Sequence, residues 1–276
     1  MVNTKFEDLE LKLLTNALYE VHGLDFRNYS VASFRRRINS FIKKSGFQTI
    51  TSLTNEVIHN NKIIYSLIEA ISVTTTEMFR DPNVFKYLRD EIVPYLKTFP
   101  HIRIWHAGIG TGEEIYSLSI ILKEENILDR CTIYATDINE NMILKVKKGI
   151  FPIKKMKDYT QNYQKSGGKK SLSDYYLANY NNVIFDQKLI QNITFAQHNL
   201  ATDSVFVECN LILCRNVMIY FNSDLQNRVI KLFHSSLTNS GVLTLGLNET
   251  LQLSPYSKKF SAISDELKIY RKVFNE

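Results

Sequence analysis

The stretch Ile102-Arg103-Ile104-Trp105-His106-Ala107-Gly108-Ile109-Gly110-Thr111-Gly112-Glu113-Glu114 predicts a β-strand, a glycine-rich turn and the start of a helix. Glycines at alternate positions let the backbone approach a nucleotide-like ligand closely. The helix opens with Glu113 and Glu114, whose charges occupy its positive end and would repel a pyrophosphate. A ligand with an adenosine half and a cationic half fits better, and S-adenosylmethionine is the obvious candidate.

The spacing around this turn supports the same ligand. Dinucleotide sites favour G-x-G-x-x-G, whereas this turn reads G-x-G-x-G and ends at Gly112. The next predicted strand, 132–136, runs into Asp137, 25 residues beyond Gly112, where a carboxylate can accept both ribose hydroxyls. The alternative is a tight strand-to-helix turn with ordinary first-turn acids, since glycine-rich turns are common. The carboxylate at Asp137 favours the ligand-binding interpretation.

Composition sets broad limits on the protein. The 276 residues, 44% of them hydrophobic and 22% charged, are ordinary for a globular chain. The net charge of +6 would suit an anionic partner without establishing one. Three cysteines without paired metal spacing indicate a reducing compartment and no metal site. Acids near the N-terminus and the lack of an apolar run of about 18 residues predict a cytoplasmic protein.

The pattern along the chain predicts three parts. Residues 1–71 form an all-helical domain, residues 72–100 a linker and a helix that closes over the cofactor, and residues 101–276 an α/β domain. In the first helix, Phe6, Leu9, Leu13 and Ala17 recur at helical spacing.

The helix predicted over 33–44 has an apolar stripe and a basic outer face. Gly46 ends it, and Arg35, Arg36 and Lys43 lie away from its stripe of Phe34, Ile38, Phe41 and Ile42. Two interpretations stay open for the basic face: a solvated surface, or a docking surface for an acidic helical partner.

From Ile102 onward, strands alternate with helices, which predicts a parallel sheet with helices on both sides. Helices are predicted over 140–148 and 223–236. Further strands are predicted over 193–196, 211–214, 241–246 and, as a final edge strand, 268–273. An insert at about 151–190 breaks the alternation, and within it 175–178 and 182–185 could pair as short antiparallel strands.

Ligands of open α/β sheets bind beyond the carboxyl ends of the strands. Gly108 to Glu113, Asp137, Asn199-Leu200, Arg215-Asn216 and Tyr220 are expected to gather there. For Tyr220, packing at a helix start is the alternative. Methyl transfer from a sulfonium to an ionised carboxylate requires alignment and charge placement rather than a strong base. This suits a site without a Ser-His-Asp set; we interpret His106 as structural, and His198 stays undecided.

Upstream of the strand, residues 72–82 form a polar, hydroxyl-rich segment. Asp81-Pro82 is a fair N-cap and N1 pair for the following helix. Capping alone does not explain Arg80, and we expect the segment to fold over the cofactor with Thr76 and Arg80 facing it.

Several motifs, in order through residues 72 to 272, carry a family resemblance: "TTTEMFRDPNVF", "IWHAGIGTGEEIYSL", "YATDINENM", "HNLATD", "LILCRNVMIYFN" and "GVLTLGLNETL". Together with "FRRRI" in the helical region, they resemble the CheR-type chemotaxis receptor methyltransferases. The resemblance implies a Rossmann-like methyltransferase sheet with a small β-subdomain insert, preceded by a small all-α domain. In some members of the family this subdomain binds a receptor tail peptide.

The resemblance also implies methylation of receptor glutamates from S-adenosylmethionine, leaving S-adenosylhomocysteine. The implied partners are the acidic, glutamate-bearing cytoplasmic helices of chemotaxis receptors, with a monomeric enzyme, no nucleic acid, no membrane insertion and no metal. Arg80 and Tyr220 match residues near the transferred methyl group. The residues expected to bind the cofactor are Thr74, Thr76, Arg80, Gly108, Glu113, Asp137, Asn199, Leu200, Arg215 and Asn216.

The chain departs from the family pattern at four places. Thr74 replaces a usual Asn, Gly110 a Ser, Ile115 a Pro, and Leu247-Asn248 a His-Ser pair. The last change motivates an alternative, a non-catalytic S-adenosylmethionine-binding signalling module. A nucleic-acid methyltransferase is disfavoured, because the segment from Asn216 to Tyr220 lacks the prolines of an Asn-Pro-Pro-aromatic turn and no aromatic-rich basic patch dominates the chain.

Overall fold

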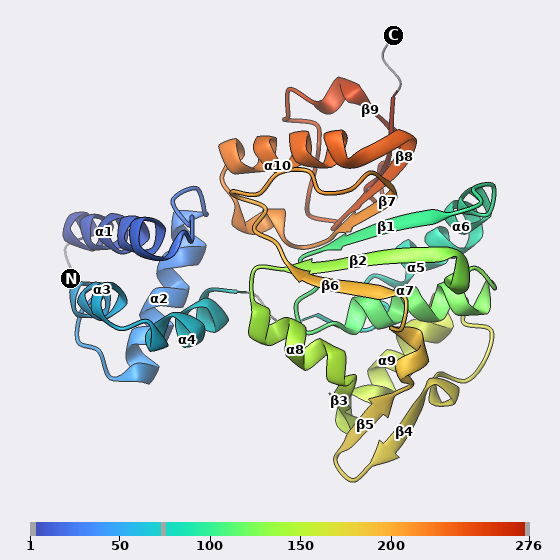
Figure 1. Ribbon diagram of the computed structural model, residues 1–276, viewed down its shortest axis with the longest axis horizontal. Coiled ribbons are helices and arrows are strands. Elements are labelled where there is room, and N and C mark those ends of the chain that lie inside the picture. Colours follow the sequence, from blue (N-terminus) through green and yellow to red (C-terminus); the bar gives the residue numbers. More distant parts are fainter. Residues whose placement is uncertain (1–3, 73–75, 274–276) are drawn as a thin grey trace.

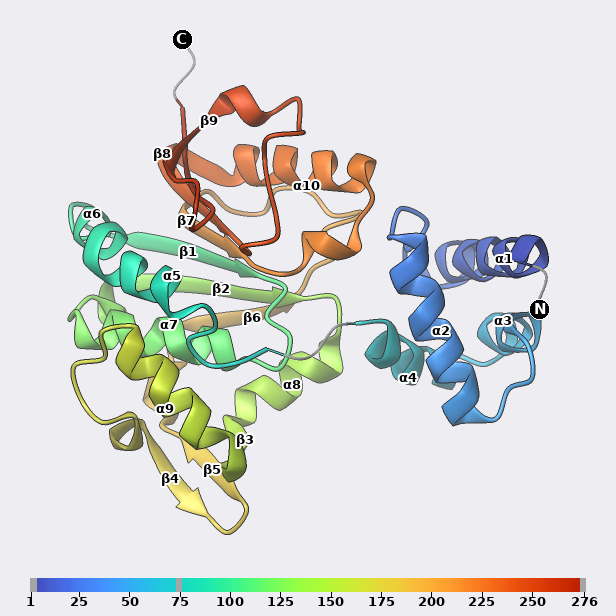
Figure 2. The ribbon, with the colours of Figure 1, turned by 180° about the vertical axis from the view of Figure 1, so that it is seen from behind.

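The computed structural model describes residues 4–72 and 76–273. Within these residues the chain forms a group of N-terminal helices, a seven-stranded sheet flanked by helices, and a small three-stranded sheet (Figures 1 and 2). Short helical turns complete the chain: η2 (Leu128–Arg130), η3 (Ile153–Lys155), η4 (Leu172–Tyr175), η5 (Gln187–Leu189), η6 (Met218–Tyr220) and η7 (Ser257–Lys259).

The N-terminal helices are α1 (Thr4–His22), α2 (Val31–Ser45), α3 (Ile50–His59) and α4 (Lys62–Ile71). The stripe predicted on α2 is confirmed as buried, and Gly46 ends that helix in the left-handed conformation. On α1, the apolar stripe that the sequence predicted does not face the core. Phe6 and Leu13 are 64% and 49% exposed, whereas Leu11, Leu14 and Leu18 are buried. Two apolar stripes satisfy the same helical spacing, and packing against α3 selected the other one.

The large sheet has the order β6 (Ile193–Gln197), β2 (Cys131–Asp137), β1 (Ile102–Ala107), β7 (Cys209–Cys214), β8 (Leu237–Leu245), β10 (Ile269–Lys272), β9 (Phe260–Ser264). The first five are parallel, as predicted. The last strand, β10, was predicted to form the edge of the sheet. That position is wrong, because β10 lies between β8 and β9 and pairs antiparallel with both. The edge is β9, a largely exposed strand whose sequence carries little periodic signal.

Side chains of successive strand residues point to opposite faces of the sheet, and each face is covered by helices. Ile102 and Ile104 pack with α5 (Pro82–Tyr87), the π-helical turn η1 (Leu88–Ile92), α6 (Val93–Leu96) and α7 (Glu113–Glu124). Trp105 and Ala107 pack with α10 (Ser223–Ser236) on the other face. The prediction of helices on both sides is therefore confirmed (Figure 1).

The insert follows α8 (Glu140–Lys148) and contains β3 (Ile150–Pro152), α9 (Met156–Lys165), β4 (Tyr176–Asn179) and β5 (Asn182–Phe185). The predicted antiparallel pair is confirmed, with Tyr176 opposite Phe185. The third strand, β3, pairs with β5 on the other side and had not been predicted. Among the helices of the described residues, none has the length and apolar character needed to span a bilayer.

Candidate functional site

The glycine turn between β1 and α7 brings its backbone close to two neighbouring segments. Gly108 has φ +74°, a conformation that L side chains rarely adopt. A Cβ atom added there would lie 2.4 Å from a methyl group of Val217. At Gly112, with φ +90°, an added Cβ would lie 2.5 Å from Val146 on α8. Close packing of the turn therefore requires glycine at both positions.

Asp137 is held rigidly at the end of β2. Its two carboxylate oxygens accept hydrogen bonds from the backbone N–H groups of Gly110, at 2.9 Å, and Asn139, at 3.0 Å. Burial raises the pKa of Asp137 above its ordinary value, and these N–H groups offset part of that effect. The carboxylate is thus pre-oriented beside the glycine turn before any ligand binds.

The first cavity, of about 750 Å³, lies between the carboxyl ends of the strands and the N-terminal helices. Six residues that the sequence predicted line it: Gly108, Asp137, Asn199, Leu200, Asn216 and Tyr220. His198, undecided from sequence, also lines it. The N-terminal helical region contributes Phe26, Tyr29, Phe34 and Arg37 to its wall, which the sequence analysis did not anticipate.

The loop between α1 and α2 is attached directly to the Tyr220 segment. The backbone N–H of Ser30 donates to the carbonyl of Tyr220 at 2.8 Å, and that of Asn222 donates to Asn28 at 2.9 Å. The guanidinium of Arg37 lies 5.3 Å from the centre of the Tyr220 ring. These contacts, nearly 200 residues apart in the chain, seat the N-terminal helices against the first cavity.

A second cavity of about 420 Å³ adjoins the first. The two share Gly108, Asn216, Val217 and Tyr220. Thr76, Arg80 and Arg215 line the second cavity, as expected for residues folding over one end of a ligand. Thr74, predicted to join them, lies outside the described residues.

Arg215 is the centre of charge in the second cavity. Its side chain is fully buried and lies 2.6 Å from the carboxylate of Asp81 and 2.8 Å from that of Glu114. It also donates to the backbone carbonyl of Arg80 at 3.1 Å. Asp81 and Pro82 occupy the N-cap and the first position of α5, as predicted, but the Asp81 side chain makes no capping hydrogen bond and its φ is +55°. The ion pair with a distant arginine, invisible in local sequence, takes the carboxylate instead.

The structure separates the two acids that begin α7. Glu113, the predicted cofactor residue, lines neither cavity; it accepts a hydrogen bond from Tyr159 at 3.0 Å and faces a cleft beside Lys155. Glu114 lines the second cavity instead. The sequence held a signal for this difference: Glu114 lies four residues before the apolar Leu118 and so shares its face of the helix, whereas Glu113 lies four residues before the polar Ser117.

Charge partners keep Glu114 ionised despite its burial. Burial acts to raise its pKa, but Arg215 and His106 outweigh it and hold the pKa below the ordinary value. The His106 Nε2 atom lies 3.4 Å from Glu114 Oε1. His106, interpreted from sequence as structural, sits on β1 and also lines the second cavity.

The two cavities suit the two halves of S-adenosylmethionine. A carboxylate and an amide in the first, at Asp137 and Asn199, match a ribose diol and an adenine edge. Groups of both signs in the second, at Glu114 and Arg80, match the ammonium and carboxylate of an amino acid. Buried polar atoms without hydrogen-bond partners, Glu114 Oε1, Asn216 Oδ1 and Arg215 Nε, gather around these cavities. Such atoms cost free energy unless a ligand pairs with them.

The part of the chain that the structure describes contains no set of side chains arranged to bind a metal ion. No group of three or more His, Cys, Asp or Glu side chains there could hold a metal ion.

Comparison with known proteins gives consistent matches. Residues 74–267 match the family described as "CheR methyltransferase, SAM binding domain". A Pseudomonas putida protein named "Putative methyltransferase Cher3" is 44% identical over 272 residues, 99% of this chain and 100% of that protein. A "Chemotaxis protein methyltransferase" of Borreliella burgdorferi is 29% identical over 88% of each chain. Among solved structures, the N-methyltransferase NodS of Bradyrhizobium japonicum with S-adenosyl-L-homocysteine is 11% identical, with a TM-score of 0.38, over 71% of this chain and 88% of that one.

Proposed function

The chain belongs to the CheR methyltransferase family, and from this premise we propose that it methylates glutamate side chains of chemotaxis receptors. The methyl donor is S-adenosylmethionine, and the products are glutamate methyl esters and S-adenosylhomocysteine. One observation carries the proposal: two adjoining cavities, one suited to adenosine and one to an amino acid, share Tyr220 in their walls.

We assign the cofactor's binding residues by cavity. Asp137, Asn199 and Leu200 would hold the adenosine half in the first cavity. Thr76, Arg80 and Arg215 would hold the methionine half in the second. Gly108 and Asn216, which line both, would face the middle of the ligand. Glu114 joins this set through its place in the second cavity, and Glu113 leaves it.

The chemistry needs little from the protein beyond alignment. When bound, S-adenosylmethionine supplies a methyl group on a positively charged sulfur. Its transfer to a glutamate oxygen would form an oxygen–carbon bond and leave the electron pair of the broken carbon–sulfur bond on sulfur. The substrate carboxylate is already ionised at neutral pH, so no general base is required. Arg80, in the second cavity, and Tyr220, which lines both cavities, orient that carboxylate, and the wall of N-terminal helices excludes water.

The proposed partner is an acidic receptor helix, met in the cytoplasm by a monomeric enzyme. Arg36 and Lys43 are exposed on α2, the helix that also brings Arg37 to the first cavity. Arg35 is less available, because it is paired with Glu7 and Asp8. The basic face of α2 therefore favours an acidic partner close to the site of methyl transfer.

The alternative of a non-catalytic module draws little support from the altered residues at 247 and 248. Leu247 is 37% exposed and lines neither of the two cavities. Replacing the family's histidine there removes no side chain from either cavity, so the enzyme remains the better proposal.

The test is transfer of a labelled methyl group to a glutamate-bearing receptor fragment. The full chain should release the label on base treatment, as a methyl ester does. Tyr220→Phe should lower turnover about 10- to 100-fold, with S-adenosylhomocysteine affinity changed little. Tyr65→Phe, at a side chain on α4 that is 60% exposed and lines neither cavity, is the matched control and should behave like the wild type. Cofactor binding without any labelled product would instead support the non-catalytic module.

A further inference from the structure

A buried carboxylate outside both cavities contacts the loop that carries cavity residues. Glu249 follows β8, is 4% exposed and lines neither cavity. Its Oε2 atom accepts the backbone N–H groups of Gly246, at 2.6 Å, and Asn216, at 3.0 Å. Its Oε1 atom accepts the N–H of Ile219 at 3.2 Å. One side chain thus joins the loop after β8 to the loop after β7.

The groups that Glu249 holds are next to those that face the ligand. Asn216 has φ +58°, an unusual conformation for a residue other than glycine, and this residue lines both cavities. Ile219 lies in the turn η6, immediately before Tyr220. The carboxylate of Glu249 therefore accepts the backbone N–H groups of Asn216 and Ile219, which no strand or helix pairs. These two hydrogen bonds hold the backbone that carries Asn216 and Tyr220.

The loop after β8 is packed too closely for this contact to be incidental. A Cβ atom added at Gly246 would lie 2.7 Å from the backbone nitrogen of Asn216 and 2.9 Å from Glu249 Oε2. Glycine at 246 lets the two loops approach, and the approach lets the carboxylate reach across.

We propose that Glu249 is a positioning residue for methyl transfer, holding Asn216 at the cofactor and Tyr220 at the reacting carboxylate. The proposal deepens the proposed function and rests on it for the roles of those two residues. A carboxylate suits the task because it offers two acceptor oxygens and no donor. An amide in its place would turn an NH₂ group toward a backbone N–H, and a buried N–H left unpaired is costly.

The substitutions Glu249→Gln and Glu249→Ala separate the two ends of this contact. In Glu249→Gln the amide oxygen can retain Gly246 and Asn216, whereas its nitrogen opposes the N–H of Ile219. Turnover should then fall about tenfold, with S-adenosylhomocysteine affinity, measured by calorimetry, within about threefold of the wild type. Glu249→Ala releases both loops, so turnover should fall about 100-fold and affinity about tenfold.

Glu124→Gln is the matched control, because Glu124 is also a buried, multiply hydrogen-bonded glutamate but lies at the far end of α7. It should lower the melting temperature without changing affinity or the balance of kcat and KM. If the Glu249 variants lose only melting temperature, as this control does, Glu249 is merely structural and the proposal is overturned.

Amide hydrogen exchange tests the positioning role without any turnover or ligand. Exchange in peptides spanning 215–221 should quicken in Glu249→Gln and more in Glu249→Ala, and should not change in Glu124→Gln. Unchanged exchange in both Glu249 variants would overturn the proposal. If the wild type methylates no receptor fragment but exchange responds as expected, the proposed substrate fails while the positioning of the loop stands.

Discussion

The two ends of α7 carry the same pair of residues and use them differently. The helix begins with Glu113-Glu114, and Glu124-Glu125 stand at its end. Acids are favoured at a helix N-terminus and disfavoured at a C-terminus, because of the helix dipole. The first pair therefore needs few partners, whereas the second needs neighbouring cations and donors.

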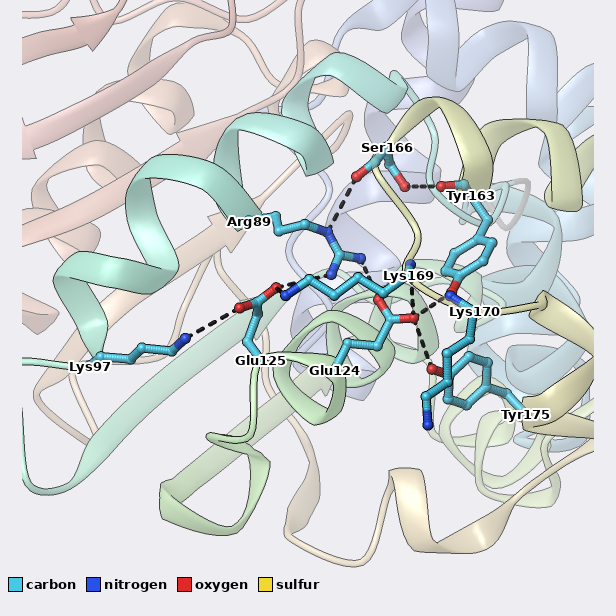
Figure 3. A network of polar contacts seen from close by, with 9 residues as sticks. All are labelled: Arg89, Lys97, Glu124, Glu125, Tyr163, Ser166, Lys169, Lys170 and Tyr175. Atoms are coloured by element: carbon cyan, nitrogen blue, oxygen red, sulfur yellow. Dashed lines mark hydrogen bonds and ion pairs between the residues drawn. The ribbon is translucent and has the colours of Figure 1, made fainter.

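The final pair receives those partners in full (Figure 3). Glu124 lies 2.6 Å from Arg89, and its Oε1 atom also accepts hydrogen bonds from the hydroxyls of Tyr163 and Tyr175. All three guanidinium nitrogens of Arg89 have partners, the others being Glu125 and the carbonyl of Ser166. Burial and Glu124 raise the pKa of Tyr163 to about 12, so its hydroxyl keeps its proton. This network anchors the insert to the sheet domain.

The initial end leaves polar atoms incompletely hydrogen-bonded beside a cavity. Arg215 Nε has no hydrogen-bond partner, and Glu114 Oε1 has only its 3.4 Å contact with His106 Nε2, although both residues are buried and form an ion pair of 2.8 Å. Buried charges are normally both paired and hydrogen-bonded. The comparison teaches that a satisfied buried ion pair indicates architecture, whereas an incompletely satisfied one beside a cavity indicates a ligand.

The largest expected effect is on stability at the satisfied end. Arg89→Met leaves Glu124 buried without its cation, and the free energy of unfolding should fall by about 3–5 kcal/mol. Denaturant titration measures this loss. Calorimetry under conditions where the variant remains folded should find wild-type affinity for S-adenosylhomocysteine. If Arg89→Met instead bound S-adenosylhomocysteine more weakly, the two ends of α7 would be coupled, and the contrast between them would not hold.

A smaller effect, on affinity, is expected at the ligand end. Glu114→Gln removes a charge from the second cavity, and binding of S-adenosylhomocysteine should weaken by about 1–3 kcal/mol. Glu113→Gln is the neighbouring control and should leave affinity unchanged, because Glu113 faces Tyr159 and Lys155. Titration calorimetry on both variants decides the matter, and the reverse ranking would restore Glu113 as the cofactor residue.

The smallest expected effect is a pH dependence of binding. Burial raises the pKa of Asp137, so on acidification it takes up a proton before an ordinary aspartate with a pKa of 3.8 would. Affinity for S-adenosylhomocysteine should therefore decline as the pH falls from neutral toward that value, since the protonated acid accepts hydrogen bonds less well. The pKa of Glu114 is shifted the other way, downward, by Arg215 and His106, so Glu114 takes up its proton at lower pH than an ordinary glutamate would. Asp137→Asn should bind more weakly but remove most of the decline; an unchanged decline would assign it to another group.

Local patterns carried most of the fold and much of the candidate site. The bounds of α8 and α10 agree with those predicted, because caps such as Gly149 and Asn222 mark them in the sequence. The residues at the carboxyl ends of the parallel strands gather at one edge, as the order of strands and helices predicted. The exposed face of α1 and the inner position of β10 were missed, since each depends on which neighbour the element meets.

By itself, the sequence determined the turn after Trp105, the acids behind it and the carboxylate of Asp137, because adjacent residues and helical or strand periodicity specify such features. Only the tertiary structure decided which of Glu113 and Glu114 faces the cavity, that N-terminal helices wall the first cavity, and that Glu249 reaches the loop of Asn216. The reason is physical: neighbouring helical residues differ by about 100° in direction, and contacts between distant segments leave no periodic trace in the chain.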